Sequence, residues 1–138
     1  MKALKEIILY IWQLPQNLLG LAILVWLRIC KRETYVKAFD FAEGERYYYC
    51  PGFPGGISLG RYIVLSSLYD HTGDHIVERH EYGHSRQSRY VGWLYLLVVG
   101  LPSLLWAAFY VYKPDNPHGY YTGFYTERWA DKLGGVQR

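Results

Sequence analysis

The residues best suited to chemistry lie in the string His80-Glu81-Tyr82-Gly83-His84. On a helix, the two histidines of this string would lie one turn apart on the same face, so both imidazoles could bind one metal ion. Glu81 would lie about 100° around the helix from His80, close enough to take a proton from a water molecule beside the ion. Zinc activates such a water near neutral pH, and a neighbouring carboxylate can act as its base. The pattern therefore predicts a zinc site with Glu81 as the catalytic base.

A second polar string near the C-terminus offers the third protein ligand that such a site needs. In Glu127-Arg128-Trp129-Ala130-Asp131, helical spacing places Glu127 and Asp131 on one face, with the small Ala130 beside them. The small side chain would let this helix approach the first one closely. We expect Glu127 to bind the ion and Asp131 to accept the N–H of a ligand histidine. Each string alone also fits an ordinary solvated helix face, but together they point to one ion.

Taken together, the two strings resemble the gluzincin metallopeptidases, which carry H-E-x-x-H on one helix and E-x-x-x-D on a later one. The sequence ERWADKLG, from Glu127 to Gly134, is particularly similar to the E-x-x-A-D ending of the membrane-embedded prenyl-protein and heat-shock peptidase group. The chain is also similar to minimal gluzincins. The resemblance covers residues 57–134 in architecture but only the two motifs in identities, and this chain is shorter than the large membrane peptidases.

What the resemblance implies is zinc-dependent hydrolysis of peptide bonds, with one Zn²⁺ ion and a peptide or protein substrate. The residues it assigns are the zinc ligands His80, His84 and Glu127, the general base Glu81, and the histidine partner Asp131. A group that stabilises the transition state is also expected opposite the metal. The sequence offers four candidates for it and does not choose among them: His118, Tyr120, Tyr121 and Tyr125.

The elements that must position these residues predict an α+β fold that is mainly helical. In chain order we expect an apolar stretch over 3–30, short strands at 47–49 and 57–66, a polar helix over 74–90 with Asp74 as its N-cap, an apolar stretch over 91–112, and a helix near 121–133 closed by Gly134-Gly135. The strands would form a small antiparallel hairpin. Segment 56–66 fits either an edge strand onto which a substrate adds as a further strand, or a buried hairpin strand.

Length and composition limit the organisation of the chain. At 138 residues we expect one domain, with an apolar N-terminal anchor or hairpin at 1–32 and a zinc-peptidase-like domain at 33–138. Hydrophobic residues make up 51% and charged residues 20%, which excludes a disordered chain. The net charge of +3 comes without a basic nucleic-acid motif, so no nucleic-acid partner is expected. Cys30 and Cys50 are expected to be reduced thiols, and no cleaved signal peptide is expected.

The two apolar stretches bear on where the protein works. Both are interrupted, at residues 13–17 and at Gly100-Leu101-Pro102, so each is expected to fold into a broken helical hairpin. A straight span of 91–112 would separate His84 from Glu127 across a bilayer. The stretches therefore either insert into one leaflet of a bilayer or form the apolar core of a compact protein. Tryptophans near the stretches and the basic edge at Arg28 favour membrane association, with the site on the cytoplasmic side.

Two other functions stay open at this point. One is a non-catalytic, zinc-stabilised membrane module that binds a partner protein, which would have a closed coordination sphere. The other is a small membrane-active protein whose histidines are incidental, which would bind no stoichiometric metal.

Overall fold

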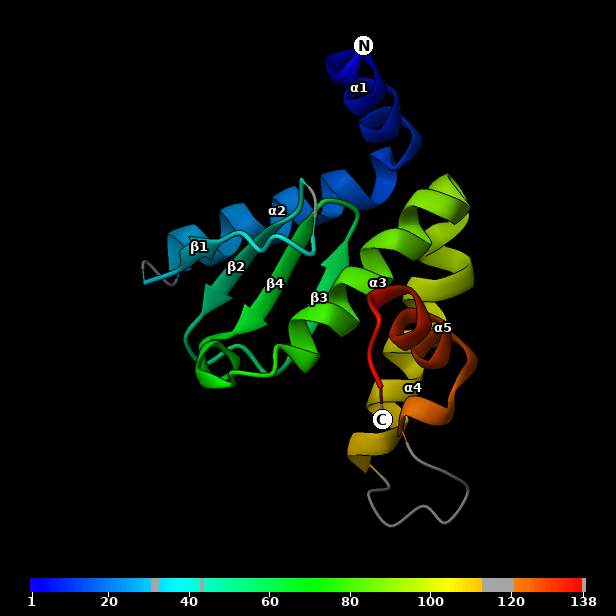
Figure 1. Cartoon of the computed structure of the whole chain (residues 1–138). Coiled ribbons are helices and arrows are strands. Elements are labelled where there is room, and N and C mark those ends of the chain that lie inside the picture. The colour runs from blue at the N-terminus through cyan, green and yellow to red at the C-terminus, as the bar shows by residue number, and fades with distance from the viewer. Residues whose placement is uncertain (31–32, 43, 113–120, 138) are drawn as a thin grey trace.

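A computed structural model describes residues 1–30, 33–42, 44–112 and 121–137 of the chain. It confirms the predicted α+β, mainly helical class (Figure 1). The α-helices within these residues are α1 (Lys2–Trp12), α2 (Leu14–Cys30), α3 (Ile76–Val91), α4 (Leu101–Tyr112) and α5 (Tyr125–Gly134). The strands are β1 (Tyr35–Lys37), β2 (Arg46–Cys50), β3 (Gly56–Leu59) and β4 (Tyr62–Ser66). Shorter helical turns are η1 (Ser67–His71), η2 (Gly92–Leu94), the π-helical η3 (Leu96–Gly100) and η4 (Tyr121–Gly123).

The strands form one mixed sheet in the order β1-β2-β4-β3. The predicted antiparallel pairing of 47–49 with 57–66 is wrong, because β2 pairs with β4 in parallel. Segment 56–66 itself folds into the antiparallel hairpin β3–β4, with Gly60 (φ +64°) in its turn. The sheet extends beyond that hairpin because β2 pairs with β4 in parallel and β1 pairs with β2 antiparallel. Segment 56–66 therefore contains both of the strand types considered for it. β3 is an edge strand, and β4 is a buried inner strand.

Alternating side chains of the inner strands supply two cores, one on each face of the sheet. Tyr47 and Ile63 point to the face covered by α3, where they pack with Tyr82. Tyr48 and Val64 point to the opposite face, where they pack against α2. The result is a three-layer arrangement in which α2 and α3 cover opposite faces of the sheet (Figure 1).

The first apolar stretch is broken as predicted. The chain turns by 86° between α1 and α2, within the interruption at residues 13–17. Polar side chains at this break are buried and attach it to the end of α3. Ser88 Oγ donates to Gln13 Oε1 (2.8 Å), and Gln16 Nε2 donates to the carbonyl of Gly92 (2.9 Å). The break is thus held by specific hydrogen bonds in the interior.

The second predicted hairpin is wrong. Residues 96–110 form one apolar helix, because the π-helical turn η3 runs directly into α4. Pro102 lies in the first turn of α4, and the wider π turn before it accommodates a residue without an N–H donor. The chain instead reverses at Gly92, which has φ +61°. A Cβ there would lie 2.2 Å from a ring carbon of Trp12, so only glycine fits this turn.

Neither apolar stretch gives a single helix that could cross a membrane within the described residues. α1 and α2 together meet the length and composition of a span, but only as the bent pair.

The polar helix starts two residues later than predicted. α3 begins at Ile76, and His75 (φ +52°) is the residue before it. Asp74 nevertheless contributes, because its Oδ1 accepts the N–H of Ile76 (3.4 Å). At the other end of the chain, α5 ends as predicted, with Gly135 (φ +71°) as its left-handed cap.

Candidate metal centre

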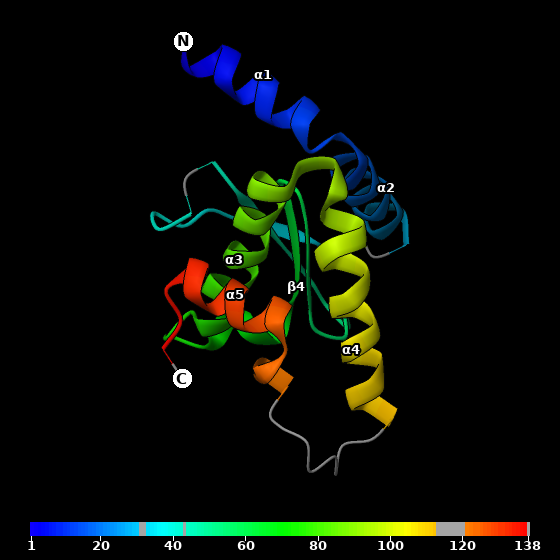
Figure 2. The same cartoon turned by 90° about the vertical axis from the view of Figure 1, so that its right-hand side faces the viewer.

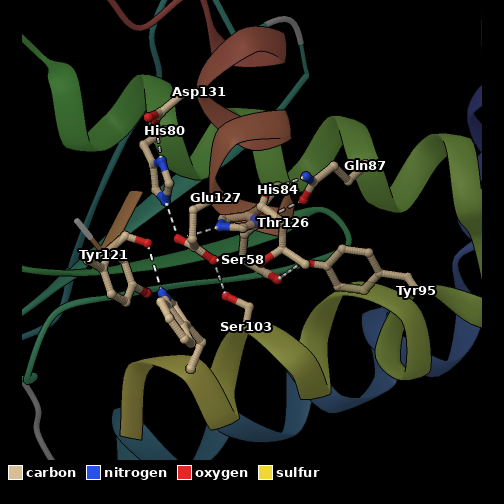
Figure 3. Close-up of polar contacts among 11 residues, drawn as sticks. Ser58, His80, His84, Gln87, Tyr95, Ser103, Tyr121, Thr126, Glu127 and Asp131 are labelled. Atoms are coloured by element: carbon tan, nitrogen blue, oxygen red, sulfur yellow. Dashed lines mark hydrogen bonds and ion pairs between the residues drawn. The ribbon is translucent and has the colours of Figure 1, made fainter. Parts of the chain in front are cut away.

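The structure brings His80 and His84 of α3 together with Glu127 of α5 (Figure 3). One atom from each of the three side chains lies within 4.8 Å of the other two. The Nε2 atom of His80 lies 3.1 Å from Glu127 Oε2, and that of His84 lies 3.6 Å from the same oxygen. All three residues are buried, so the side chains converge on one interior point. This buried His-His-Glu group can hold a metal ion.

Glycines allow α3 and α5 to approach closely enough to form the group. A Cβ on Gly83 would lie 1.9 Å from the carbonyl oxygen of Ala130, and one on Gly134 would lie 1.9 Å from that of Arg79. Both distances are far inside van der Waals contact. The two helices therefore touch backbone to backbone, with Gly83 one residue before the ligand His84 and Ala130 one turn after Glu127.

Hydrogen bonds to the far nitrogen of each imidazole orient the two rings. His80 Nδ1 donates to Asp131 Oδ1 (2.6 Å), as the spacing of the C-terminal string predicts. His84 Nδ1 donates to Gln87 Oε1 (2.7 Å), and the amide of Gln87 is itself fixed by donating to the carbonyl of Thr126 (2.7 Å). Both rings then direct Nε2, the atom left for a metal, toward Glu127.

Glu127 is held by hydroxyl groups as well as by the imidazoles. Its Oε1 accepts a hydrogen bond from Ser103 of α4 (2.5 Å) and one from Thr126 (3.0 Å). These bonds leave Oε2 directed at the histidines. Ser103 and Gln87 were not predicted as site residues. For Gln87 a signal existed, since it lies three residues after His84 on the same helix, and Ser103 is the one hydroxyl amino acid in the apolar run 96–109.

The electrostatics of the group favour a positive charge at its centre. Burial alone would lower the pKa of His80, but hydrogen bonds to Asp131 and Glu127 outweigh it and raise this pKa to about 10. Burial would likewise raise the pKa of Glu127, yet the hydrogen bonds from the two imidazoles hold it well below its usual range. The carboxylates that stabilise protonated His80 would also stabilise a metal cation. Metal binding requires neutral imidazoles and ionised carboxylates.

A cavity of about 330 Å³ lies beside the group, and Glu81 forms part of its wall together with His80 and His84. Glu81 is buried, and its Oε2 has no hydrogen-bond partner. Burial raises the pKa of this carboxyl, against the lowering effect of the two histidines. An unpartnered buried carboxylate oxygen is costly unless something outside the protein's own side chains binds it.

The edge strand β3 also lines this cavity. Gly56 lies so close to Glu81 that a Cβ on it would be 2.4 Å from Glu81 Oε1. Ser58 also lines the cavity, and its carbonyl accepts a hydrogen bond from Tyr95 (2.9 Å), a buried residue that the sequence did not single out. In an antiparallel pair, alternate residues direct their backbone groups to the same edge. The backbone groups of Gly56 and Ser58 accordingly face away from β4, toward the cavity.

The four candidates for transition-state stabilisation fall in different places. Tyr121 lines the cavity, and its hydroxyl interacts with Glu127. Tyr125 is half exposed, and its hydroxyl donates to the carbonyl of Val98 (2.6 Å), so its side chain is directed elsewhere. His118 and Tyr120 lie outside the described residues. Both cysteines are free, as expected.

Comparisons with known proteins give no independent indication of what the site binds. No family model matches the chain, and no curated protein or solved structure matches it.

Proposed function

We propose that this protein is a zinc-dependent peptidase of the gluzincin type. The observation that carries the proposal is the position of Glu81. Its buried, unpartnered carboxylate oxygen lies in a cavity between the His80–His84–Glu127 group and the free edge of β3. A metal site with a purely structural role would not need an additional buried carboxylate with an unpartnered oxygen beside it.

The donor set favours zinc over other common ions. Two imidazole nitrogens and one carboxylate oxygen are the ligands of catalytic zinc, which keeps its fourth position open. Ligand atoms about 2 Å from a tetrahedral zinc ion lie roughly 3.3 Å apart, and the two His–Glu127 separations are 3.1 and 3.6 Å. Among the residues that the structure describes, the group has three members and no fourth histidine, cysteine, aspartate or glutamate. When bound there, zinc supplies a Lewis acid that activates water and polarises the scissile carbonyl.

Glu81 is suited to move the proton in that reaction. As the general base it takes a proton from the attacking water, and as the acid it gives this proton to the leaving amine. Burial, which raises the pKa of the Glu81 carboxyl, moves it toward the range where both steps are efficient. Tyr121, whose side chain lines the same cavity, is the described candidate for a donor to the developing oxyanion.

The substrate would bind as an added strand along β3. The backbone groups of Gly56 and Ser58 face the cavity, and the absence of a side chain at Gly56 leaves Glu81 accessible to a peptide lying there. Tyr95, which directly precedes η3, donates a hydrogen bond to the carbonyl of Ser58 and so ties the edge strand to the start of the η3–α4 helix. A peptide in this position would present a backbone carbonyl to the ligand group.

The decisive experiment separates metal binding from turnover. Glu81→Gln should retain one zinc ion per chain but lower the rate of cleavage of an internally quenched peptide library about a thousandfold. The matched control is Glu78→Gln on the same helix. Glu78 is also buried and, like Glu81, has one carboxylate oxygen without a hydrogen-bond partner. It does not line the cavity, and its other oxygen accepts a hydrogen bond from Tyr49 (2.7 Å), so its amide variant should keep both zinc and turnover.

A second variant tests the ligand group itself. His84→Ala should lose stoichiometric zinc and, with it, all turnover. If wild type binds one zinc ion and cleaves no peptide, the protein is instead the non-catalytic module. If wild type binds no metal, both proposals fail.

A further inference from the structure

Most of the large hydrophobic side chains that are exposed in the described residues come from α1, α2, the turn η2 and the continuous helix η3–α4. Figure 2 shows α2 and α4 on the same side of the molecule. We call this set the apolar face. Its members are Leu4, Ile7, Ile8, Ile11, Trp12, Leu18, Leu19, Leu21, Val25, Trp26, Ile29, Trp93, Leu94, Leu97, Val98, Leu101, Leu104, Leu105 and Phe109. An exposed apolar surface of this extent marks a contact with something other than water.

The composition of the apolar face identifies lipid as its partner. Residues 93–112 contain no charged side chain, whereas the exposed surface of a protein–protein interface normally has a polar rim. α2 carries apolar side chains on both sides, since Leu24 and Leu27 face the sheet while Val25 and Trp26 are exposed. A helix that is apolar all round belongs in a core or in lipid.

Charges at the ends of the apolar helices complement an anionic lipid surface. Lys2 and Lys5 are exposed in the first turns of α1, and Arg28 is exposed in the last turn of α2. Exposed Trp12 and Trp93 lie where the two apolar stretches meet the end of α3. Tryptophan and basic side chains are favoured at the boundary between acyl chains and headgroups. The arrangement fits helices that lie in one leaflet.

The cavity of the metal centre opens onto this face. Leu19 of α2 and Leu101 and Leu104 of α4 line the cavity, and the same three residues are 45%, 49% and 63% exposed. Lining residues that are themselves about half exposed, from both α2 and α4, indicate that the cavity reaches the surface between these helices. Figure 3 shows Ser103 of α4 projecting from the same helix toward Glu127.

We infer that the apolar face lies in the membrane and that the cavity opens into lipid between α2 and α4, so that the substrates are peptides whose apolar segment is embedded in the bilayer. Such a segment would reach the edge of β3 without leaving lipid. The cavity wall on that side is apolar, with Ile57, Leu96 and Ala107, so large apolar side chains next to the scissile bond would be preferred. The substrate part of this inference rests on the proposed peptidase function, but the membrane part does not.

Vesicle flotation tests the membrane part without requiring activity. The full chain carrying Glu81→Gln should float with phosphatidylcholine–phosphatidylglycerol vesicles. Adding Leu105→Glu on the apolar face should weaken this binding about tenfold, because a charged side chain replaces a lipid-immersed leucine. The matched control is Leu68→Glu in η1, an exposed leucine outside the apolar face (77%), which should leave flotation unchanged. A protein that stays out of the vesicles, or a discrete dimer that buries α4, would overturn the assignment to lipid.

Cleavage in vesicles tests the access route. Peptides of one cleavable sequence, with and without a membrane-spanning leucine–alanine segment, are offered to the vesicle-bound wild type. The embedded peptide should be cleaved at least tenfold faster. Leu104→Trp should narrow the opening and lower that rate about tenfold, with flotation retained, whereas Leu68→Trp should lower neither.

The outcomes separate this inference from the function on which it rests. Equal cleavage of the two peptides, or equal rates for the Leu104 and Leu68 variants, would overturn lateral access while leaving the peptidase intact. Flotation with no cleavage of either peptide would overturn the peptidase and the substrate class but retain the membrane face.

Discussion

The helices that build the metal centre and the helices that flank it distribute polar and apolar side chains in opposite ways. α3 buries ionisable and amide side chains, among them Glu78, Glu81 and Gln87. α4 exposes leucines such as Leu104 and Leu105. Both departures from the usual pattern are expensive in water, because buried charge and exposed apolar surface each raise the free energy of the folded state. The buried His-His-Glu group of α3 and α5 can hold a metal ion, and lipid is the partner that we propose for α2 and α4.

The two regions also differ in how tightly their positions are specified. The polar region is fixed by backbone contact and by a connected set of hydrogen bonds, which leaves little freedom for a neighbouring atom. The apolar region is attached through hydrogen bonds such as those of Trp12, Gln13 and Gln16, but its outer leucines are exposed and lack neighbours on that side. Substitutions should consequently have large effects in the first region and small ones in the second, when both are measured in water.

The largest effect is expected where α3 touches α5. Gly83→Ala would place a methyl group 1.9 Å from the carbonyl of Ala130, so the helices must separate. We expect the free energy of unfolding to fall by about 3 kcal/mol, although alanine is the better helix former, and zinc binding should be lost. Gly73→Ala is the control, because no atom lies within 4 Å of the added Cβ. Thermal unfolding and zinc content of both variants check this, and a normal Gly83→Ala protein would contradict the close approach.

A pair of leucine truncations compares the inside of the sheet with the apolar face. Leu65→Ala removes a fully buried side chain of β4 and should cost about 3 kcal/mol. Leu105→Ala removes a side chain that is 61% exposed and should cost less than about 0.5 kcal/mol in water. Chemical denaturation of both variants gives the two values. Similar losses would show that Leu105 is packed in a core and would remove it from the lipid-facing surface.

Within the metal centre, the residues behind the ligands should tune affinity. Asp131→Ala removes the acceptor for His80 Nδ1 and should weaken zinc binding about tenfold to a hundredfold, without abolishing it. Lys132→Ala, the next residue on α5, is the control. Competition with a chromogenic chelator measures both. Unchanged affinity in the Asp131 variant would mean that this carboxylate does not orient the ligand.

A small effect is also expected at the surface ion pair of Lys37 and Asp70, which lies outside both the metal centre and the apolar face. Lys37 Nζ lies 2.5 Å from Asp70 Oδ1, and the lysine is largely exposed. Lys37→Ala should change the free energy of unfolding by less than about 1 kcal/mol. The hydrogen bond from Lys37 lowers the pKa of Asp70. Any stabilisation should therefore be complete above the ordinary aspartate pKa of 3.8 and be lost as the pH falls through the lower pKa of the folded state. A pH titration of unfolding for wild type and variant measures this.

Local sequence patterns predicted the core of the site but not its surroundings. His80 and His84 could be predicted as a pair because they lie one helical turn apart in the same short string. Glu127 and its neighbour Asp131 could be predicted for the same reason. Ser103 and Tyr95 could not be, because their contacts with Glu127 and Ser58 join residues that only tertiary packing brings together. The same holds for the parallel β2–β4 pairing, which no hairpin signal announces.

The wrong hairpin has a similar physical cause. Gly100 and Pro102 are residues that often end a helix. Here Gly100 ends the π-helical turn η3, Pro102 lies in the first turn of α4, and the helix continues through both. Gly92 was not singled out from the sequence. It turns the chain because Trp12, some eighty residues earlier in the sequence, packs where its side chain would be. The position of the break was thus decided by a tertiary contact, which overrides local propensity.

The most direct test of the account is X-ray absorption at the zinc edge of the purified, zinc-loaded full chain. Convergence of His80, His84 and Glu127 on one ion predicts one zinc per chain with a first shell of nitrogen and oxygen only, including two imidazoles. Loss of one oxygen from that shell, or of the metal itself, is expected in Glu127→Ala, and an unchanged shell in Glu81→Gln. A sulfur ligand, a third imidazole, or zinc bound equally well without the Glu127 carboxylate would contradict it.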